Sequence, residues 1–263
     1  MLRRQLLTGL MMTVAMIVLV GLIFPLAVTG VSQLVFKDKA NGSMVKNADG
    51  KVVGSSLIGQ SFADKDGNPL PQYLQPRPSK AGDGYDGLAS SASNLAPSNA
   101  KLIGNVPGVA YDSDGNQIKT NPYATKADPY CVPVPATDKS GNDVTDPHGN
   151  PVYEKTATGE YVCDPDTIPE RTLAYRALNG LAAAVKVPAD AVTASGSGLD
   201  PQISLANARL QAPRIAKARG VPVAEVQKVI NSHTQARQLG FLGEQTVNVL
   251  ELNLALDRLA PTS

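Results

Sequence analysis

Residues 6–28 read LLTGLMMTVAMIVLVGLIFPLAV, and no charged side chain occurs between Arg4 and Lys37. At about 1.5 Å rise per residue, a helix over this stretch is about 35 Å long, enough to cross a hydrocarbon core of about 30 Å with some tilt. The stretch therefore predicts one transmembrane helix over residues 6–28. We expect the protein to act at a membrane.

The charges on either side of this helix predict its orientation. Arg3 and Arg4 directly precede it, whereas the first charges after it are Lys37, Asp38 and Lys39. The positive-inside rule then places residues 1–5 in the cytoplasm. No later window approaches eighteen apolar residues, so we expect the rest of the chain to lie on the outer side. A cleaved secretory signal is the alternative, but this apolar stretch exceeds the usual length of about 7–15 residues.

Composition limits the function of the exported part. Without Arg3 and Arg4, 22 of the 24 basic residues remain against 23 acidic ones, a formal charge near −1. Such a balance disfavours nucleic-acid binding. The chain has no G-x-S-x-G or H-E-x-x-H motif, and its two histidines are His148 and His233. The sequence therefore predicts a protein without a catalytic site or a metal site.

Both cysteines, Cys131 and Cys163, fall in the part that we expect to be exported. Oxidation is permitted there, so a disulfide between them is the favoured interpretation. Metal binding is the alternative, but these cysteines and the nearby His148 lack the usual C-x-x-C spacing.

The exported part is predicted to be one α+β domain. A hairpin should turn at Asp49-Gly50, and residues 75–100 have the composition of a loop. The last third predicts helices over about 170–186, 204–219 and 222–234. Residues 247–259 fit either a strand or a helix, and the capping pair Asn248 and Glu251 favours a helix after a short strand.

Between about Gly104 and Pro169 the chain is rich in turns. Units of the type D-x-x-G-N predict tight turns with glycine at positive φ, and they occur at 112–116, 138–142 and 146–150, with an earlier one at 64–68. Their oxygens resemble parts of a calcium loop, but the complete pattern with its terminal glutamate is missing. We expect a turn- and β-rich segment.

The glycine-rich piece ASGSGLD, residues 194–200, has two interpretations. It could cradle an anion at the start of the following helix, although it lacks the lysine of a P-loop. Alternatively, it is a tight turn that leads into that helix, which is the favoured interpretation. The triplet Arg77-Pro78-Ser79 likewise fits an ordinary exposed loop.

At these same residues the chain resembles the KdpC family, the C subunit of the Kdp potassium-transporting P-type ATPase. The resemblance covers about Met1–Ile103 and Glu170–Leu259, and it leaves 104–169 as an insertion in a domain formed by 29–103 and 170–263. The resembling blocks are Ala40–Ser43, Gly54–Phe62, Arg77–Ser79, Ser93–Asn99, Val192–Asp200, Pro213–Gly220 and Val247–Asp257.

The resemblance implies a non-catalytic accessory subunit of a high-affinity potassium uptake pump in the bacterial inner (cytoplasmic) membrane. Its implied partners are a channel-like potassium-translocating subunit, an ATP-hydrolysing subunit and a small single-span subunit. Members are described as stabilising the assembly and as catalytic chaperones that raise ATP affinity, and a second view places the domain over the outer potassium entrance. The block compared with nucleotide motifs is Ser195, Gly196, Ser197, Gly198, Leu199 and Asp200.

Direct ATP contact conflicts with the predicted orientation, because ATP is cytoplasmic and this block should lie outside. We therefore expect no tightly bound cofactor, and a block that is structural or faces the channel-like subunit. Gly9 and Thr13 are small side chains four residues apart that permit close packing against a partner helix. Further partner contacts are predicted at Arg77, Ser79, Asn94 and Asn99. The alternative function is a free-standing membrane-anchored binding or surface protein.

Overall fold

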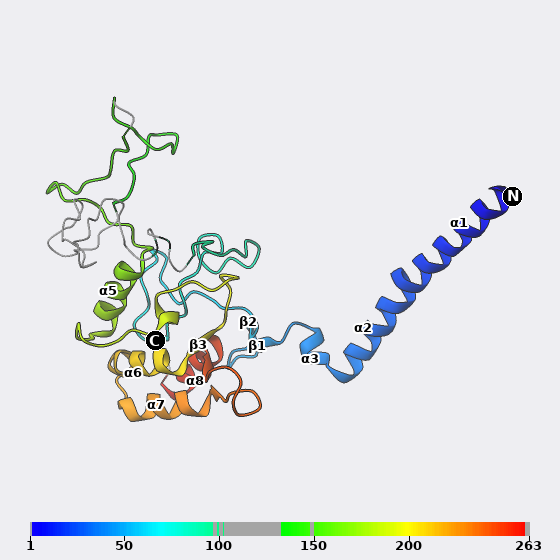
Figure 1. The fold of residues 1–263 in the computed structure, drawn as a ribbon. Helices are drawn as coiled ribbons and strands as arrows, with labels where there is room; N and C mark the ends of the chain where they lie inside the picture. Colours follow the sequence, from blue (N-terminus) through cyan, green and yellow to red (C-terminus); the bar gives the residue numbers. More distant parts are fainter. Residues whose placement is uncertain (1, 97–98, 100–101, 103–132, 148–149, 261–263) are drawn as a thin grey trace. The chain divides into compact units, whose positions relative to one another are not determined.

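The computed structural model describes residues 2–96, 99, 102, 133–147 and 150–260 (Figure 1). It forms two compact units, Met1–Ile58 and Gly59–Ser263. The first contains the predicted membrane anchor, and the second contains the α+β domain. The predicted boundaries of the domain and its insertion remain a prediction.

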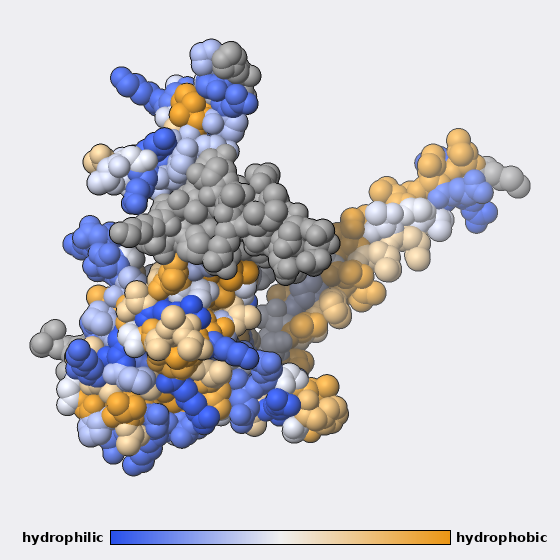
Figure 2. Space-filling view, turned by 60° about the vertical axis from the view of Figure 1, so that its left-hand side comes forward, coloured by the Kyte–Doolittle hydropathy of each residue, from blue (hydrophilic) through white to orange (hydrophobic). Residues whose placement is uncertain are grey.

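The anchor is one helical stretch with a widened turn inside it. Helix α1 (Leu2–Val18) continues through a π-helical turn, η1 (Leu19–Ile23), into α2 (Phe24–Val35). The helix widens just before Pro25. Proline has no N–H to donate, and in a regular α-helix its ring clashes with the carbonyl group four residues earlier. The span Leu2–Val35 is apolar and long enough to cross a membrane (Figure 2).

This helix is longer than the predicted stretch 6–28. Residues 29–35 continue it because they contain no charge or helix-breaking proline, and the helix ends only where Phe36 leaves the helical conformation. A short helix, α3 (Lys37–Ala40), follows. The predicted hairpin is confirmed: β1 (Met44–Lys46) pairs antiparallel with β2 (Val52–Ser55), and Gly50 in the turn has φ +77°.

The second unit packs helices against a small antiparallel sheet. Strand β5 (Thr246–Asn248) lies in the middle, between β3 (Gln202–Ser204) and β4 (Thr234–Gln235). Sequence-distant residues therefore meet in this sheet. The helices are α5 (Ile168–Asn179), the 3-10 turn η2 (Ala189–Ala191), α6 (Leu205–Arg219), α7 (Val223–Ser232) and α8 (Val249–Leu259).

Side-chain caps fix where α6 and α8 begin. Ser204 Oγ accepts a hydrogen bond from Asn207 N at 3.1 Å, and Asn248 Oδ1 accepts one from Glu251 N at 3.1 Å, as the sequence predicts. The predicted end of the first helix near Lys186 is wrong. Helix α5 stops at Asn179 because Gly180 takes the left-handed conformation, with φ +61°.

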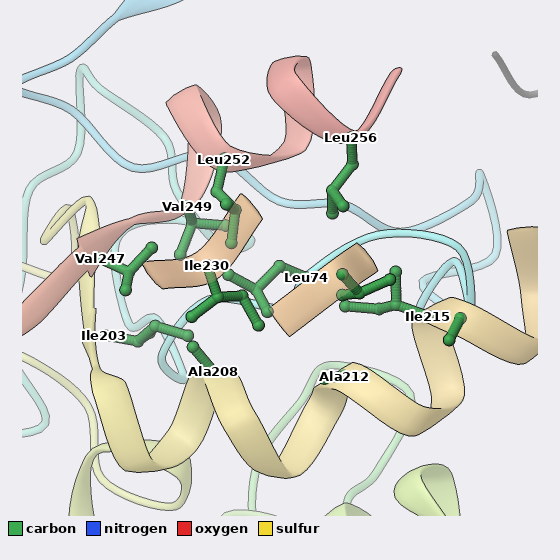
Figure 3. Close-up of a cluster of buried hydrophobic side chains, with 12 residues drawn as sticks. Leu74, Ile203, Ala208, Ala212, Ile215, Ile230, Val247, Val249, Leu252 and Leu256 are labelled. Carbon is green, nitrogen blue, oxygen red and sulfur yellow. The ribbon is translucent and has the colours of Figure 1, made fainter. Parts of the chain in front are cut away.

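The hydrophobic core lies between α6, α7 and α8 (Figure 3). Ile215 from α6, Ile230 from α7 and Leu252 from α8 are all buried. Leu74 comes from an irregular segment far away in the sequence, yet it is fully buried among them. An irregular segment therefore contributes to the core as a regular element would.

Two amide side chains hold the backbone at this point. Leu74 N donates to Asn253 Oδ1 at 2.8 Å, and Asn253 Nδ2 donates to Leu74 O at 3.0 Å. Gln75 N donates to Gln211 Oε1 at 2.8 Å, and Gln211 Nε2 donates to Gln75 O at 3.1 Å. We call this pair of contacts the amide clamp. It satisfies backbone groups that burial removes from water.

Two arginines fix the residues just before the clamp. Arg214 donates to the carbonyl oxygens of Pro71 at 2.5 Å and Tyr73 at 3.1 Å, and burial lowers its pKa to about 10, so it remains cationic at neutral pH. Arg219, whose side chain is 0% exposed, donates to Gln72 O at 2.8 Å and pairs with Asp257 at 2.8 Å. Two arginines of α6 therefore hold the segment before Leu74 through its carbonyl groups.

The described part of the predicted insertion is built from turns. Asp138 N donates to Asn142 O, Asp138 Oδ1 accepts from two following backbone N–H groups, and Gly141 has φ +81°, as predicted. Isolated antiparallel bridges such as Pro135 to Tyr153 connect the turns. Cys163 is disulfide-bonded. Cys131 and the turn unit 112–116 lie outside the described residues.

Replacing Asn253 with leucine should destabilise the domain by about 2 to 4 kcal/mol, because the buried N–H and C=O of Leu74 both lose their partner. Thermal unfolding of the full chain in detergent, followed by circular dichroism, measures the effect. Gln227→Leu makes a similar change on the exposed face of α7 and should leave the melting temperature nearly unchanged. Equal shifts in both variants would contradict the role of the clamp.

Candidate functional site

The amide clamp leads directly to Arg77, which binds the glycine-rich block. Arg77 Nη1 lies 3.1 Å from Asp200 Oδ2, and the side chains are 23% and 31% exposed. The same guanidinium donates to Thr193 O and Ala194 O over 3.4–3.5 Å. The structure thus brings together two motifs that the sequence shows 116 or more residues apart.

Ser79 fixes the next point of contact. Its Oγ donates to Gly198 O at 2.7 Å and accepts hydrogen bonds from Tyr85 N at 2.8 Å and Ala81 N at 3.2 Å. Ser90 Oγ and Ser91 N donate to the carbonyl of the block's Ser197, at 2.9 and 3.0 Å. Residues 77–91, which we call the cradle segment, therefore hold the block along its length.

Two glycines permit this close approach. Gly198 has φ +70°, and a Cβ there would lie 2.6 Å from Ser91 O and 2.8 Å from Ala81 N. Gly59 N donates to Leu199 O at 2.8 Å, and a Cβ on Gly59 would lie 2.7 Å from Asp200 O. A larger residue at position 198 must push the block and the cradle segment apart, and one at position 59 must push its own segment away from Asp200 and Tyr85.

The side chain of Tyr85 makes a hydrogen bond within the cradle segment. Its hydroxyl donates to Arg77 O at 2.8 Å. Burial, with Asp200 nearby as a smaller cause, raises the pKa of this phenol well above its usual value. Tyr175 behaves similarly: its hydroxyl donates to Asn207 Oδ1 at 2.8 Å, and burial followed by the charge of Asp190 raises its pKa. Both tyrosines are therefore neutral donors at physiological pH.

The block does not adjoin the start of a helix. Strand β3 follows it, and α6 begins only at Leu205, where Ser204 is the cap. The block's carbonyls of Ser197, Gly198 and Leu199 accept the hydrogen bonds of the neighbouring segments. Phosphate binding at a glycine-rich loop instead uses free backbone N–H groups at a helix N-terminus. This geometry supports the tight-turn interpretation.

The hollow beside the Arg77–Asp200 pair is rich in carboxylates. It measures about 460 Å³, and Asp190, Asp200 and Glu244 are among its lining residues. Asp190 holds the start of α6 in place, because its carboxylate accepts hydrogen bonds from Ser204 N, Ser204 Oγ and Asn207 Nδ2. Within the described ranges, no group of three or more His, Cys, Asp or Glu side chains is arranged to hold a metal ion.

The cradle segment is also tied to helix α5. Lys80 and Arg171 both pair with Asp166, the latter at 2.8 Å. Desolvation opposes ionisation of Asp166, but the two cations outweigh it and lower the pKa of the carboxyl. Arg171 also donates to Val192 O at 3.2 Å. Helix α5, the cradle segment and the block therefore share one polar network.

The other predicted contact residues are Asn94 and Asn99 in the domain and Gly9 and Thr13 on the anchor. Asn94 is exposed, with φ +54°, and Asn99 is partly buried. On the anchor, Thr13 Oγ1 donates to Gly9 O at 2.9 Å, and a Cβ on Gly9 would meet no atom within 4 Å. All of these partner contacts remain predictions, since the structure contains this chain alone.

Sequence reasoning missed several residues that build the site. Gly59 lies inside a resembling block, so that block pointed to it without giving its role. Tyr85, Gln211 and Asn253 carried no motif of their own. The side chains of Gln211 and Asn253 act on segments distant in sequence, such as Leu74, which lies 179 residues before Asn253, whereas Tyr85 donates to Arg77, 8 residues earlier. No local pattern signals such contacts.

Gly198→Ala should destabilise the domain by at least about 2 kcal/mol and loosen the cradle segment. The left-handed backbone and the contact with Ser91 O both oppose a Cβ at this position. Limited proteolysis within residues 79–91 and thermal unfolding measure the two effects. Gly196→Ala is the matched control in the same block, because a Cβ there meets no atom within 4 Å. If both variants match the wild type in melting temperature and in proteolysis, the close approach of the block and the cradle segment does not stabilise the domain.

Alkaline pH should destabilise the domain through its buried tyrosines. Because the folded-state pKa values of Tyr85 and Tyr175 are raised, their contribution to stability is complete below pH 10, the unfolded value, and is lost above it. The free energy of unfolding should fall by about 1.4 kcal/mol per pH unit for each tyrosine. Arg214, whose pKa burial lowers to about 10, contributes an opposite slope in the same range, so the test compares two chains in which this contribution is the same. In denaturation curves between pH 8 and about 11.5, Tyr85→Phe should lose stability above pH 10 less steeply than the wild type, by about 1.4 kcal/mol per pH unit. An unchanged slope would contradict the assignment.

Comparison with known proteins shows the family of this chain. The model of the family described as "KdpC: K+-transporting ATPase, c chain" matches residues 6–155 and 165–258. A potassium-transporting ATPase KdpC subunit of Mycobacterium tuberculosis is 43% identical over 257 residues, which is 98% of this chain and 100% of that protein. One from Caulobacter vibrioides is 42% identical over 244 residues, 93% of this chain and 88% of that protein. The chain belongs to the KdpC family of potassium-transporting ATPase subunits.

Proposed function

We propose that this chain is a non-catalytic accessory subunit of a high-affinity, ATP-driven potassium uptake pump, and that it stabilises the assembly of that pump. The observation that carries the proposal is the family match over residues 6–155 and 165–258. The single apolar span Leu2–Val35 supports it, because a subunit of a membrane pump needs such an anchor. Its proposed partners are a channel-like potassium-translocating subunit, an ATP-hydrolysing subunit and a small single-span subunit.

The proposed orientation has the N-terminus in the cytoplasm and the α+β domain outside the bacterial inner membrane. Arg3 and Arg4 support it, since the nearest cationic cluster lies before the apolar span. In this orientation the domain is available to the outer side of the channel-like subunit. Arg77, Ser79, Asn94, Asn99 and the block Ser195–Asp200 remain its proposed contact region.

We further propose that the chain acts as a catalytic chaperone, raising the ATP affinity of the ATP-hydrolysing subunit without touching ATP. Hydrogen bonds from neighbouring segments already engage the block's carbonyls. The adjacent hollow is lined by Asp190, Asp200 and Glu244, and its cation Arg77 is already paired with Asp200. Carboxylates repel the phosphates of a nucleotide. The proposed route of the effect is the anchor helix and its contacts with the other subunits.

The purified pump, with and without this chain, tests the chaperone role. Omitting the chain should raise the ATP concentration needed for half-maximal hydrolysis. In pump that has assembled with it, Gly196→Trp should leave that concentration unchanged even where it weakens the contact with the channel-like subunit, because the proposed effect on ATP runs through the anchor helix. Gly196 is exposed and a Cβ there meets no atom within 4 Å, so the added ring would obstruct any nucleotide at the block. A higher ATP concentration for half-maximal hydrolysis in a fully assembled G196W pump would indicate direct contact with ATP and would contradict the proposed route.

Gly9→Leu should weaken recovery of the pump complex by about tenfold, equivalent to about 1.4 kcal/mol of lost association free energy. A large side chain at Gly9 separates the helix backbones that the small side chains of Gly9 and Thr13 would let approach. Co-purification with the channel-like subunit measures this loss. Gly30→Leu is the matched control in the same span, since Gly30 also has open space around it. Equal recovery of both variants would reject the proposed contact.

A further inference from the structure

The backbone hydrogen bonding of the anchor is interrupted where the π-helical turn η1 meets Pro25. Phe24 N donates to Leu19 O, five residues earlier, instead of to Val20 O as in a regular α-helix. The next residue, Pro25, has no N–H to donate. Val20 O therefore loses the backbone donors four and five residues further along the chain. Gly21 O also loses its regular donor, because that donor would be the nitrogen of Pro25.

The side chains of the anchor do not replace these donors. Thr13 and Thr29 are the polar residues nearest to Val20 along the span. Thr13 Oγ1 already donates to Gly9 O at 2.9 Å. Thr29 lies nine residues after Val20, about 14 Å along a helix axis, which is beyond the reach of a hydroxyl group.

The position of Val20 makes a carbonyl group without a donor unfavourable. Val20 lies near the middle of the apolar span Leu2–Val35, which is long enough to cross a membrane. Lipid tails offer no hydrogen-bond donor at this depth, and an unpaired backbone group there is costly. A donor from outside the chain would remove that cost.

A shallow groove of about 650 Å³ lies along the same part of the anchor. Residues three and four apart share one face of a helix. The groove is lined in this spacing by Met12, Thr13, Met16, Ile17, Val20 and Gly21. The two residues whose carbonyl groups lost their donors are therefore part of this groove. Because Gly21 has no side chain, a second helix can approach the backbone closely at this end.

The sequence favours another polypeptide over a second copy of this chain as the occupant of the groove. Copies of one chain have the same charges around the span and so insert in the same orientation. Residues 14–28 contain no hydroxyl, amide or charged side chain. A parallel copy therefore has no side-chain donor at the depth of Val20, and the donor must come from a different membrane protein.

We propose that the carbonyl group of Val20 is a hydrogen-bond acceptor for a partner transmembrane helix. This helix lies in the groove and donates from a serine, threonine, asparagine or glutamine side chain near the middle of the bilayer. The proposal rests on the proposed function, because it takes the helix from another subunit of the pump. It adds the chemistry that the partner needs and the place on the anchor where that chemistry is recognised.

Photo-crosslinking in the assembled pump identifies the partner helix. The crosslinker p-benzoylphenylalanine is placed at position 17, in the groove, or at position 22, which does not line it. Position 17 should crosslink to a helix of another subunit more strongly than position 22. Mass spectrometry should locate the crosslink within one helical turn of a serine, threonine, asparagine or glutamine of that helix.

Replacing this partner residue with alanine should lower recovery of the complex about threefold to tenfold, the usual effect of one such hydrogen bond between membrane helices. Pro25→Ala supplies the missing N–H and allows regular α-helical pairing, so the same partner change should then have little effect. Val28→Ala is the matched control, because it shortens an apolar side chain of the span without adding a backbone donor. In V28A the partner change should retain its full effect.

The outcomes separate this acceptor site from the proposed function. A wild-type chain that recovers no other pump subunit would contradict the proposed function and the acceptor site with it. With the complex intact, three results would overturn the acceptor site alone. These are crosslinking from position 17 no stronger than from position 22, a crosslinked helix without a polar side chain at that depth, and equal effects of the partner change in P25A and V28A.

Discussion

Asn253 and Gln211 pair with the backbones of two neighbouring residues, Leu74 and Gln75, much as an adjacent strand would. A buried irregular segment needs such partners, because each unpaired N–H or C=O costs about 1–3 kcal/mol. The amide clamp lets Leu74 enter the core between α6 and α8 without a regular element around it. The path of the chain beyond Gln75 depends on this constraint.

The site follows from that path. Two residues after the clamp, Arg77 reaches Asp200, and Ser79 then reaches Gly198. The glycine-rich block is thereby held by a segment that is itself anchored in the core. Bound in this way, the block has the features of a rigid structural joint. A pump subunit that must present a defined surface to its partners benefits from such a joint more than from a mobile nucleotide loop.

Local chemistry predicted much of the fold. The uncharged stretch 6–28, the turn at Asp49-Gly50 and the caps at Ser204 and Asn248 each depend on near neighbours, and each was confirmed. Helix α5 ended earlier than predicted, because Gly180 terminates the helix although the helical spacing of apolar residues continues beyond it. The amide clamp was not predictable, because polar side chains on helices usually face solvent and their partners lie more than 130 residues away.

We propose that the block belongs to an exported domain and acts as a structural joint, so that any effect on ATP is indirect. Labelling Ser197→Cys with a membrane-impermeant maleimide tests this most directly, because Ser197 is exposed. Leu88→Cys, in the same domain, and Leu2→Cys, at the other end of the anchor, are the controls. S197C and L88C should be labelled in cells with an intact inner membrane, and L2C only after that membrane is broken. The reverse pattern would place the block on the side of cytoplasmic ATP and would rule out an exported domain.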